Sequence, residues 1–91
     1  MQGEIVENVL MNKKAKLALM KWDPFQIGED AYELESSDVI LALQEIDDPT
    51  ELARVIQKVY EQSFEIWIPF EDCVEMAYQL IAIKFEAKSI I

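Results

Sequence analysis

Turn-forming residues are scarce in this chain, and that scarcity constrains its fold more than any other feature. The 91 residues include only two glycines and three prolines, whereas a protein of many short strands needs turn residues at every chain reversal. Hydrophobic residues make up 52% of the chain, which supplies a core and excludes a disordered acidic tail. We therefore expect one domain over residues 1–91, built from long helices with few connections.

Apolar residues recur at intervals of three and four in four segments, as in amphipathic helices. The segments cover residues 4–21, residues 30–46, a stretch from Pro49 whose apolar stripe reaches Trp67, and a stretch that begins after Pro69. Pro24 ends the first helix near Trp22, because proline disfavours helical geometry in the residue before it. The third helix has the clearest start, with three residues suited to a capping box: Asp48, Pro49 and Glu51.

Short connections make consecutive helices antiparallel neighbours. The expected fold is therefore all-α, a compact four-helix, bundle-like domain. The C-terminal helix is apolar around most of its girth, so we expect it to be central and surrounded by the other three. The first helix is less regular, since Lys13 and Lys14 interrupt a stripe of Ile5, Val6, Val9, Leu10, Leu17 and Met20. We expect residues 1–15 to fray or to pack loosely.

The net charge of −10 limits the kinds of partner. Phosphate-bearing partners are repelled, so we expect neither nucleic acid nor an anionic membrane to bind. Basic proteins and cations are permitted, or the acidity serves only to keep the domain in solution. The sequence contains no apolar run of about 18 residues and no signal-peptide pattern, so we expect a cytoplasmic protein.

The chain lacks the residue types that most enzymes and metal sites use. Histidine is absent and Cys73 is the only cysteine, so no disulfide, zinc site or cysteine–histidine pair can form within one chain. We expect Cys73 to be a buried structural residue, because free cysteine is usually buried. We expect no enzymatic activity and no cofactor.

Acidic residues are concentrated in one part of the chain. Nine lie between Glu29 and Glu51 with no basic residue among them, whereas residues 13–21 contain four lysines and no acid. Three interpretations remain open: a solvated face, a docking surface for a basic protein, and a site for a hard cation such as Ca²⁺ or Mg²⁺. The candidate contact residues are Glu29, Asp30, Glu33, Glu35 and Asp38.

Paired carboxylates also serve acid–base catalysis, and Glu33, Glu35 and Asp38 are candidates for that role. We do not favour it, because a bundle of this size offers little room for the cleft that glycoside hydrolysis needs.

Large apolar residues crowd the connection before the last helix: Phe64, Ile66, Trp67, Ile68 and Phe70. Either the chain bends so that all of them are buried, or some remain exposed and form a contact with a partner or a second copy. We expect a monomer or a weak homodimer.

A motif resembles a known family. The chain contains Trp22-Asp23-Pro24-Phe25, Gly28 and Tyr32, followed by Glu35, Asp38, Asp47-Asp48-Pro49, Ile56, Tyr60, Ser63-Phe64, Asp72-Cys73, Ala77 and Leu80-Ile81-Ala82-Ile83-Lys84. Together these residues resemble the YugE-like family of small acidic proteins of unknown function from Bacillus and its relatives. The resemblance implies a compact helical domain in a bacterial cytoplasm, and it implies no activity.

The motif has two physical interpretations. In the structural one, the Asp23 carboxylate accepts backbone N–H groups in the turn, while Trp22 anchors the loop and its indole N–H finds an acceptor. In the functional one, Trp22, Phe25, Tyr32 and Asp38 line a small groove.

The sequence thus predicts a non-enzymatic protein–protein interaction module that uses its acidic surface. The alternative is a protein that binds a hard cation or a small ligand.

Overall fold

A computed structural model describes the backbone of residues 2–90 and the side chains of residues 9–87. Over this part of the chain, the secondary structure is helical and includes no strand. The elements are α1 (Gln2–Trp22), the short 3-10 helix η1 (Glu29–Tyr32), α2 (Glu33–Glu45), α3 (Pro49–Phe64) and α4 (Phe70–Ile90). The predicted all-α fold of four helices is confirmed. The backbone is helical from Gln2 onward, whereas the side chains of Ile5 and Val6 lie outside the described residues.

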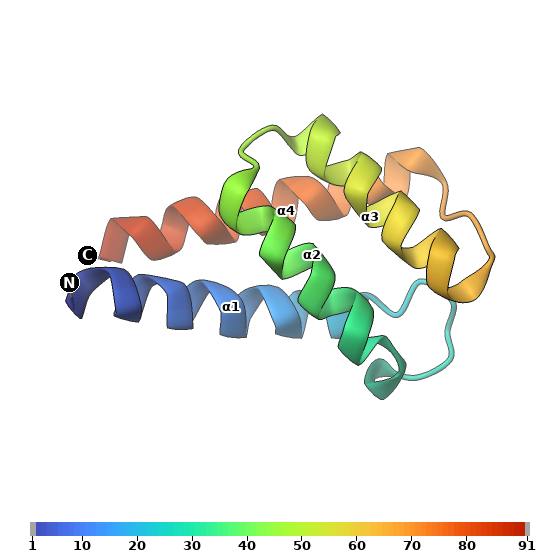
Figure 1. The fold of residues 1–91 in the computed structure, drawn as a ribbon, viewed down its shortest axis with the longest axis horizontal. Coiled ribbons are helices and arrows are strands. Elements are labelled where there is room, and N and C mark those ends of the chain that lie inside the picture. Colours follow the sequence, from blue (N-terminus) through green and yellow to red (C-terminus); the bar gives the residue numbers. More distant parts are fainter. Residues whose placement is uncertain (1, 91) are drawn as a thin grey trace.

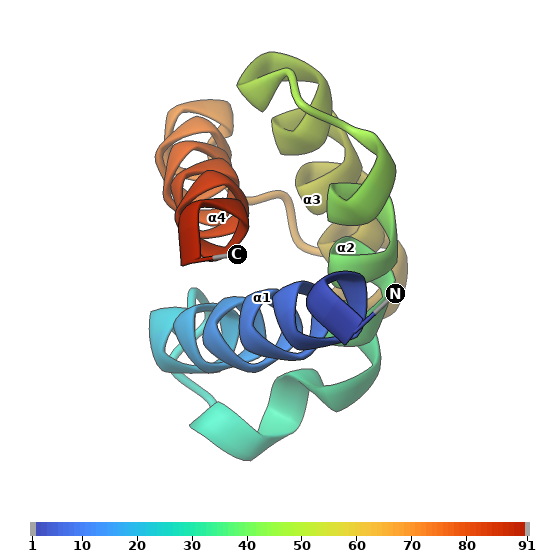
Figure 2. The ribbon, with the colours of Figure 1, turned by 90° about the vertical axis from the view of Figure 1, so that its left-hand side faces the viewer.

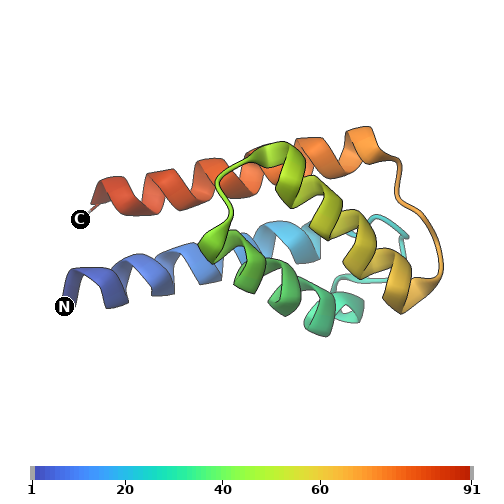
Figure 3. The same ribbon diagram turned by 45° about the horizontal axis from the view of Figure 1, so that its top comes forward.

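Two antiparallel helix pairs build the domain. The long helices α1 and α4 run in opposite directions, and their free ends lie at the same end of the molecule (Figure 1). The shorter pair, α2 and α3, crosses them obliquely (Figure 3). Seen along the longest axis of the molecule, the four helices surround a shared core (Figure 2). Each helix packs against the next one in sequence, and α4 contacts all three others.

The C-terminal helix α4 is central in its contacts, but it is not enclosed. Its inner face is buried, with Cys73, Ala77 and Leu80 fully inaccessible. Its outer face reaches solvent, where Tyr78 and Phe85 are 61% and 48% exposed. The four helices share one core, so each of them keeps a solvent side.

The predicted buried stripe of α1 is wrong at two positions, since Val9 and Leu17 are more than half exposed. The buried face is formed by Met11, Ala15 and Leu19 instead, which the helical period places on one side. Hydropathy alone gave no weight to Ala15, a small residue that suits a close approach between helices.

Helix α3 begins as predicted, but it ends at Phe64, before the predicted apolar stripe reaches Trp67. The Asp48 carboxylate accepts the backbone N–H of Thr50 at 3.3 Å, and Pro49 occupies the first helical position. Glu65 then adopts the left-handed conformation (φ 58°), and its N–H bonds the carbonyl of Glu61. Because this residue ends the helix, Trp67 leaves the buried stripe and is 62% exposed.

A buried lysine connects α4 to the end of α2. The side chain of Lys84 is almost completely inaccessible, and its ammonium donates to the carbonyls of Leu43 (2.7 Å), Ile46 (3.2 Å) and Gln44 (3.4 Å). These carbonyls belong to the last turn of α2 and its cap, which have no donor partners further along the helix. An ion pair with the Asp47 carboxylate at 2.8 Å balances the buried charge. Lys84 therefore satisfies a helix terminus while its own charge is neutralised there.

We predict that Lys84→Met destabilises the fold by about 1–3 kcal/mol, because the buried carbonyl of Leu43 and the partly buried carbonyls of Gln44 and Ile46 lose their donor. Methionine preserves most of the apolar stem, so the change isolates the ammonium. Urea unfolding followed by circular dichroism measures the effect. The matched control is Lys58→Met on the exposed surface of α3, where a change of no more than about 0.5 kcal/mol is expected. Equal losses in the two variants would contradict a capping role.

Candidate functional site

The connection between α1 and η1 is held by the carboxylate of Asp23. Its Oδ1 accepts the N–H of Ile27 at 3.0 Å and the hydroxyl of Tyr32 at 2.5 Å, and its Oδ2 accepts the N–H of Gly28 at 3.2 Å. The predicted acceptance of backbone N–H groups by Asp23 is confirmed. Gly28 has φ 107°, a conformation that residues with a Cβ rarely adopt, although a Cβ there would meet no atom within 4 Å. The backbone conformation of the turn, and not close packing, therefore requires glycine at this position.

These hydrogen bonds shift two pKa values in opposite directions. The hydroxyl of Tyr32, and then the backbone N–H groups of Ile27 and Gly28, lower the pKa of the Asp23 carboxyl below its ordinary value. Burial, reinforced by the hydrogen bond to Asp23, raises the pKa of Tyr32. Near neutral pH, the ionised carboxylate of Asp23 and the neutral hydroxyl of Tyr32 therefore stabilise each other.

An aromatic cluster packs beneath this connection. The ring centroids of Trp22 and Tyr60 lie 5.6 Å apart, those of Phe25 and Phe64 5.1 Å, and those of Tyr32 and Phe64 5.5 Å, all edge to face. Tyr32 and Tyr60 are fully buried. The rings thus fill the space between α1, η1 and α3, a geometry that supports the structural interpretation of the motif over the groove.

Two polar atoms of this cluster have no hydrogen-bond partner among the described residues. The indole N–H of Trp22 makes no hydrogen bond among the described residues, so its expected acceptor is missing there. The hydroxyl of Tyr60 is buried and also has no partner in that part of the chain; burial and the charge of Glu35 raise its pKa. Asp38, the fourth residue of the proposed groove, lies on the exposed side of α2.

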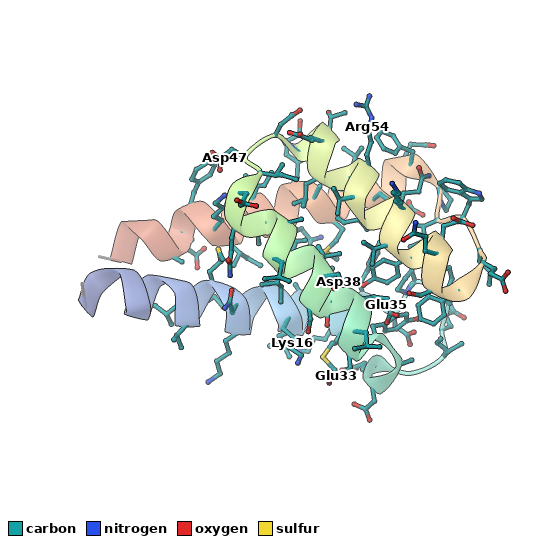
Figure 4. The ribbon with its side chains drawn as sticks, in the orientation of Figure 1. Lys16, Glu33, Glu35, Asp38, Asp47 and Arg54 are labelled. Atoms are coloured by element: carbon teal, nitrogen blue, oxygen red, sulfur yellow. The ribbon has the colours of Figure 1, made fainter. Side chains whose placement is uncertain are left out.

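The five acidic contact residues do not share one surface. Glu29, Asp30, Glu33 and Asp38 are exposed, whereas Glu35 is only 7% exposed. Glu35 lies four residues before the buried Val39, so the helical period turns it toward the core. Glu33 forms an ion pair with Lys16 across the junction of α1 with α2 (Figure 4).

Neither a metal centre nor a membrane span is apparent in the described part of the chain. Among these residues, no three acidic or cysteine side chains come close enough together to hold a metal ion. None of the helices, over the residues searched, combines the length and the apolar character needed to cross a bilayer.

Sequence reasoning missed an exposed apolar face on α2. Leu34 and Leu41 are 76% and 63% exposed, and Asp38 and Glu45 lie between and beyond them on the same side of the helix. The signal was present in the sequence, since two leucines seven residues apart share one face, opposite the buried Val39 and Leu43. We call Leu34, Asp38, Leu41 and Glu45 the α2 outer face.

Helix α1 also has an exposed apolar face, but with basic neighbours. Val9 and Leu17 are 58% and 54% exposed. An open groove of about 270 Å³ runs along this side, lined by Lys13, Lys16, Leu17 and Met20. We call Val9, Lys13, Leu17 and Met20 the α1 outer face.

Cys73 is fully buried in the core, as predicted. Burial, with a smaller contribution from Asp72, raises the pKa of its thiol to about 11. The thiolate, which is the reactive form, is therefore scarce near neutral pH.

Taken together, the fold and these surfaces define a small acidic helical domain with two exposed helix faces of opposite charge. Residues 14–90 match the family described as domain of unknown function (DUF1871), and the chain belongs to that family.

Two relatives show the extent of the similarity. The chain is 47% identical over 66 residues to the "Uncharacterized protein YugE" of Bacillus subtilis (strain 168), an alignment that covers 72% of this chain and 77% of the relative. It is also similar to the crystal structure of APC36109 from Bacillus stearothermophilus, with a TM-score of 0.83 and 38% identity over 85% of this chain and 95% of the other. The resemblance inferred from the motif is thereby confirmed.

We predict that the Asp23 carboxylate contributes stability that depends on pH. Because the folded-state pKa lies below the unfolded one, the contribution is present above pH about 4 and is lost as the pH falls through the folded value. The difference in urea midpoint between the wild type and Asp23→Asn should therefore shrink on acidification from about pH 6 to about pH 3. In Tyr32→Phe, NMR titration should show the pKa of Asp23 rising toward its ordinary value. A pKa unchanged by Tyr32→Phe would contradict the role given to the hydroxyl.

We predict that Cys73 resists thiol reagents in the folded protein. At about pH 8 a disulfide reagent such as DTNB should react about a hundredfold or more slowly with the native chain than with the urea-unfolded chain, since burial suppresses both access and thiolate. The chain has one cysteine, so the absorbance change reports that site alone. Similar rates in the two states would contradict the buried assignment.

Proposed function

We propose that this protein is a non-enzymatic interaction module whose α2 outer face binds a partner protein with a basic contact surface. The observation behind the proposal is the exposure of Leu34 and Leu41 on the same helix face as Asp38 and Glu45. Exposed apolar side chains bordered by polar residues are typical of protein contact sites.

The two kinds of residue on this face have different roles in binding. The leucines supply apolar area, which gives affinity when it is removed from water. The carboxylates determine the sign of the charge on the partner's contact surface, because charge complementarity raises the association rate and excludes competitors with acidic contact surfaces. The chemistry therefore favours a partner surface with apolar side chains flanked by lysine or arginine.

The contact set differs from the acidic run as a whole. Glu35 is buried, and Glu33 is already paired with Lys16, so reversing the charge of either residue would disturb the fold as well as a contact. Asp38 is exposed and accepts no hydrogen bond among the described residues, and the same is true of Glu29 and Asp30 in the preceding turn. These three carboxylates, together with Glu45 on the α2 outer face, are available to a partner.

The test is affinity purification of the tagged protein from its native lysate, comparing the wild type with Leu34→Ser/Leu41→Ser and with Asp38→Lys. We expect the wild type to retain a protein with a basic contact surface at low salt and less of it at high salt. Both α2 variants should lose it. The leucines are exposed, so their replacement should leave thermal unfolding unchanged.

The matched control is Tyr78→Ser, which removes an apolar side chain of similar exposure (61%) from the outer face of α4. This variant should retain the partner. A partner retained equally by every variant would show that the contact lies elsewhere, and the placement on α2 would then be wrong.

A further inference from the structure

The two exposed helix faces have matching patterns of opposite charge. On α1, Lys13 lies between the exposed Val9 and Leu17; on α2, Asp38 lies between the exposed Leu34 and Leu41. Each face is thus a charged residue between two apolar ones, basic in one case and acidic in the other.

The spacings are also similar. Val9 and Leu17 are eight residues apart, which corresponds to about 12 Å along a helix, and Leu34 and Leu41 are seven apart, which corresponds to about 10.5 Å. If the apolar pairs of two such faces meet, Lys13 lies opposite Asp38 whether the helices are parallel or antiparallel. The charged pair is central in either arrangement, where surrounding apolar groups reduce its screening by solvent.

We infer that the α2 outer face binds the α1 outer face of a second copy of this chain, so that the protein forms a homodimer. The inference rests on the proposed function, because it names the partner of the same α2 surface. The basic, apolar surface that the proposal requires is present on the molecule itself.

The two faces cannot meet within one chain, since they point away from the core on two helices that are already packed together. Across the junction between these helices, the side-chain amide of Gln44 donates to Asn12 at 3.5 Å. Lys16 pairs with Glu33 at the same junction (Figure 4). Viewed end-on, α1 and α2 are neighbours at the edge of the domain (Figure 2). A two-fold axis near this junction would pair α1 with α2 of the partner and α2 with α1 of the partner, so every contact occurs twice.

The charges around the contact favour this pairing. Lys13 and Asp38 form no ion pair among the described residues, so both are available to the other copy. Lys16 is held by Glu33, and Lys14 is held by Glu86 at 2.8 Å on the side of α1 that faces α4. Lys13 is therefore the basic residue that the α1 outer face itself offers.

Charge exchange tests the inference. Sedimentation velocity of the full chain over about 10–500 μM, the range of weak dimers, should show a dimer for the wild type. Lys13→Glu and Asp38→Lys should each weaken it about tenfold or more, because each variant places like charges opposite one another. An equimolar mixture of the two variants should dimerise again. In the mixed dimer, one contact pairs the two substituted side chains, which have opposite charges, and the other contact is the wild-type pair of Lys13 with Asp38.

Matched control variants carry the same charge changes on other helices. Arg54→Glu on α3, far from the α1–α2 junction (Figure 4), and Glu75→Lys on α4 are both at exposed positions and should leave the dimer unchanged. Circular dichroism of every variant establishes that it is folded.

The outcomes separate this inference from the proposed function. A wild type that is monomeric at all concentrations, or a mixture that stays monomeric, overturns the homodimer. The proposed function then still stands if, in the affinity purification, the α2 variants lose a different protein that the wild type retains. A wild-type dimer that both single variants weaken, and that their mixture restores, supports the inference.

Discussion

The hydrogen bond between the buried Tyr32 and the carboxylate of Asp23 is the interaction on which the arrangement of the helices depends. The Tyr32 ring lies in the aromatic cluster, and its hydroxyl meets the turn that ends α1. Tyr32 is also the residue before α2. Its side chain therefore holds the end of the connection that follows α1 and fixes the position at which α2 begins. The direction in which α2 leaves this point determines which of its faces reaches solvent.

A second constraint acts at the opposite end of α2. The ammonium of Lys84 binds the final carbonyls of the helix, so α2 is held by Tyr32 at its start and by α4 at its end. Between these two points, Val39 and Leu43 occupy the core while Leu34 and Leu41 stay outside. With both ends fixed, the helix cannot rotate to bury its outer leucines without losing the buried ones. The exposed apolar face therefore follows from the fold.

The sequence predicted those features that depend on local chemistry. Proline and aspartate placed the end of α1 and the start of α3, and the hydrophobic period located the four helices. Predictions failed where tertiary packing decided the result. The inner face of α1 contains Ala15, to which hydropathy gives little weight, and the left-handed Glu65 ended α3 although its apolar stripe continued. The burial of Glu35 could be expected only once Val39 was known to face inward. The capping by Lys84 joins residues about 40 positions apart, which no local pattern reveals.

The large negative charge opposes self-association, since two copies of net charge −10 repel each other. That repulsion acts between charges spread over the whole surface, and at physiological ionic strength charges more than about 8 Å apart are largely screened. A lysine and an aspartate in contact between apolar side chains lie well inside that distance and lose far less to screening. Added salt would weaken the general repulsion and the local attraction together, so the salt dependence of a dimer would be small even if the pair were essential. Only a change in the sign of the individual charges separates the two effects, because exchanging Lys13 and Asp38 between copies alters the contact and leaves the total charge of the pair of chains unchanged.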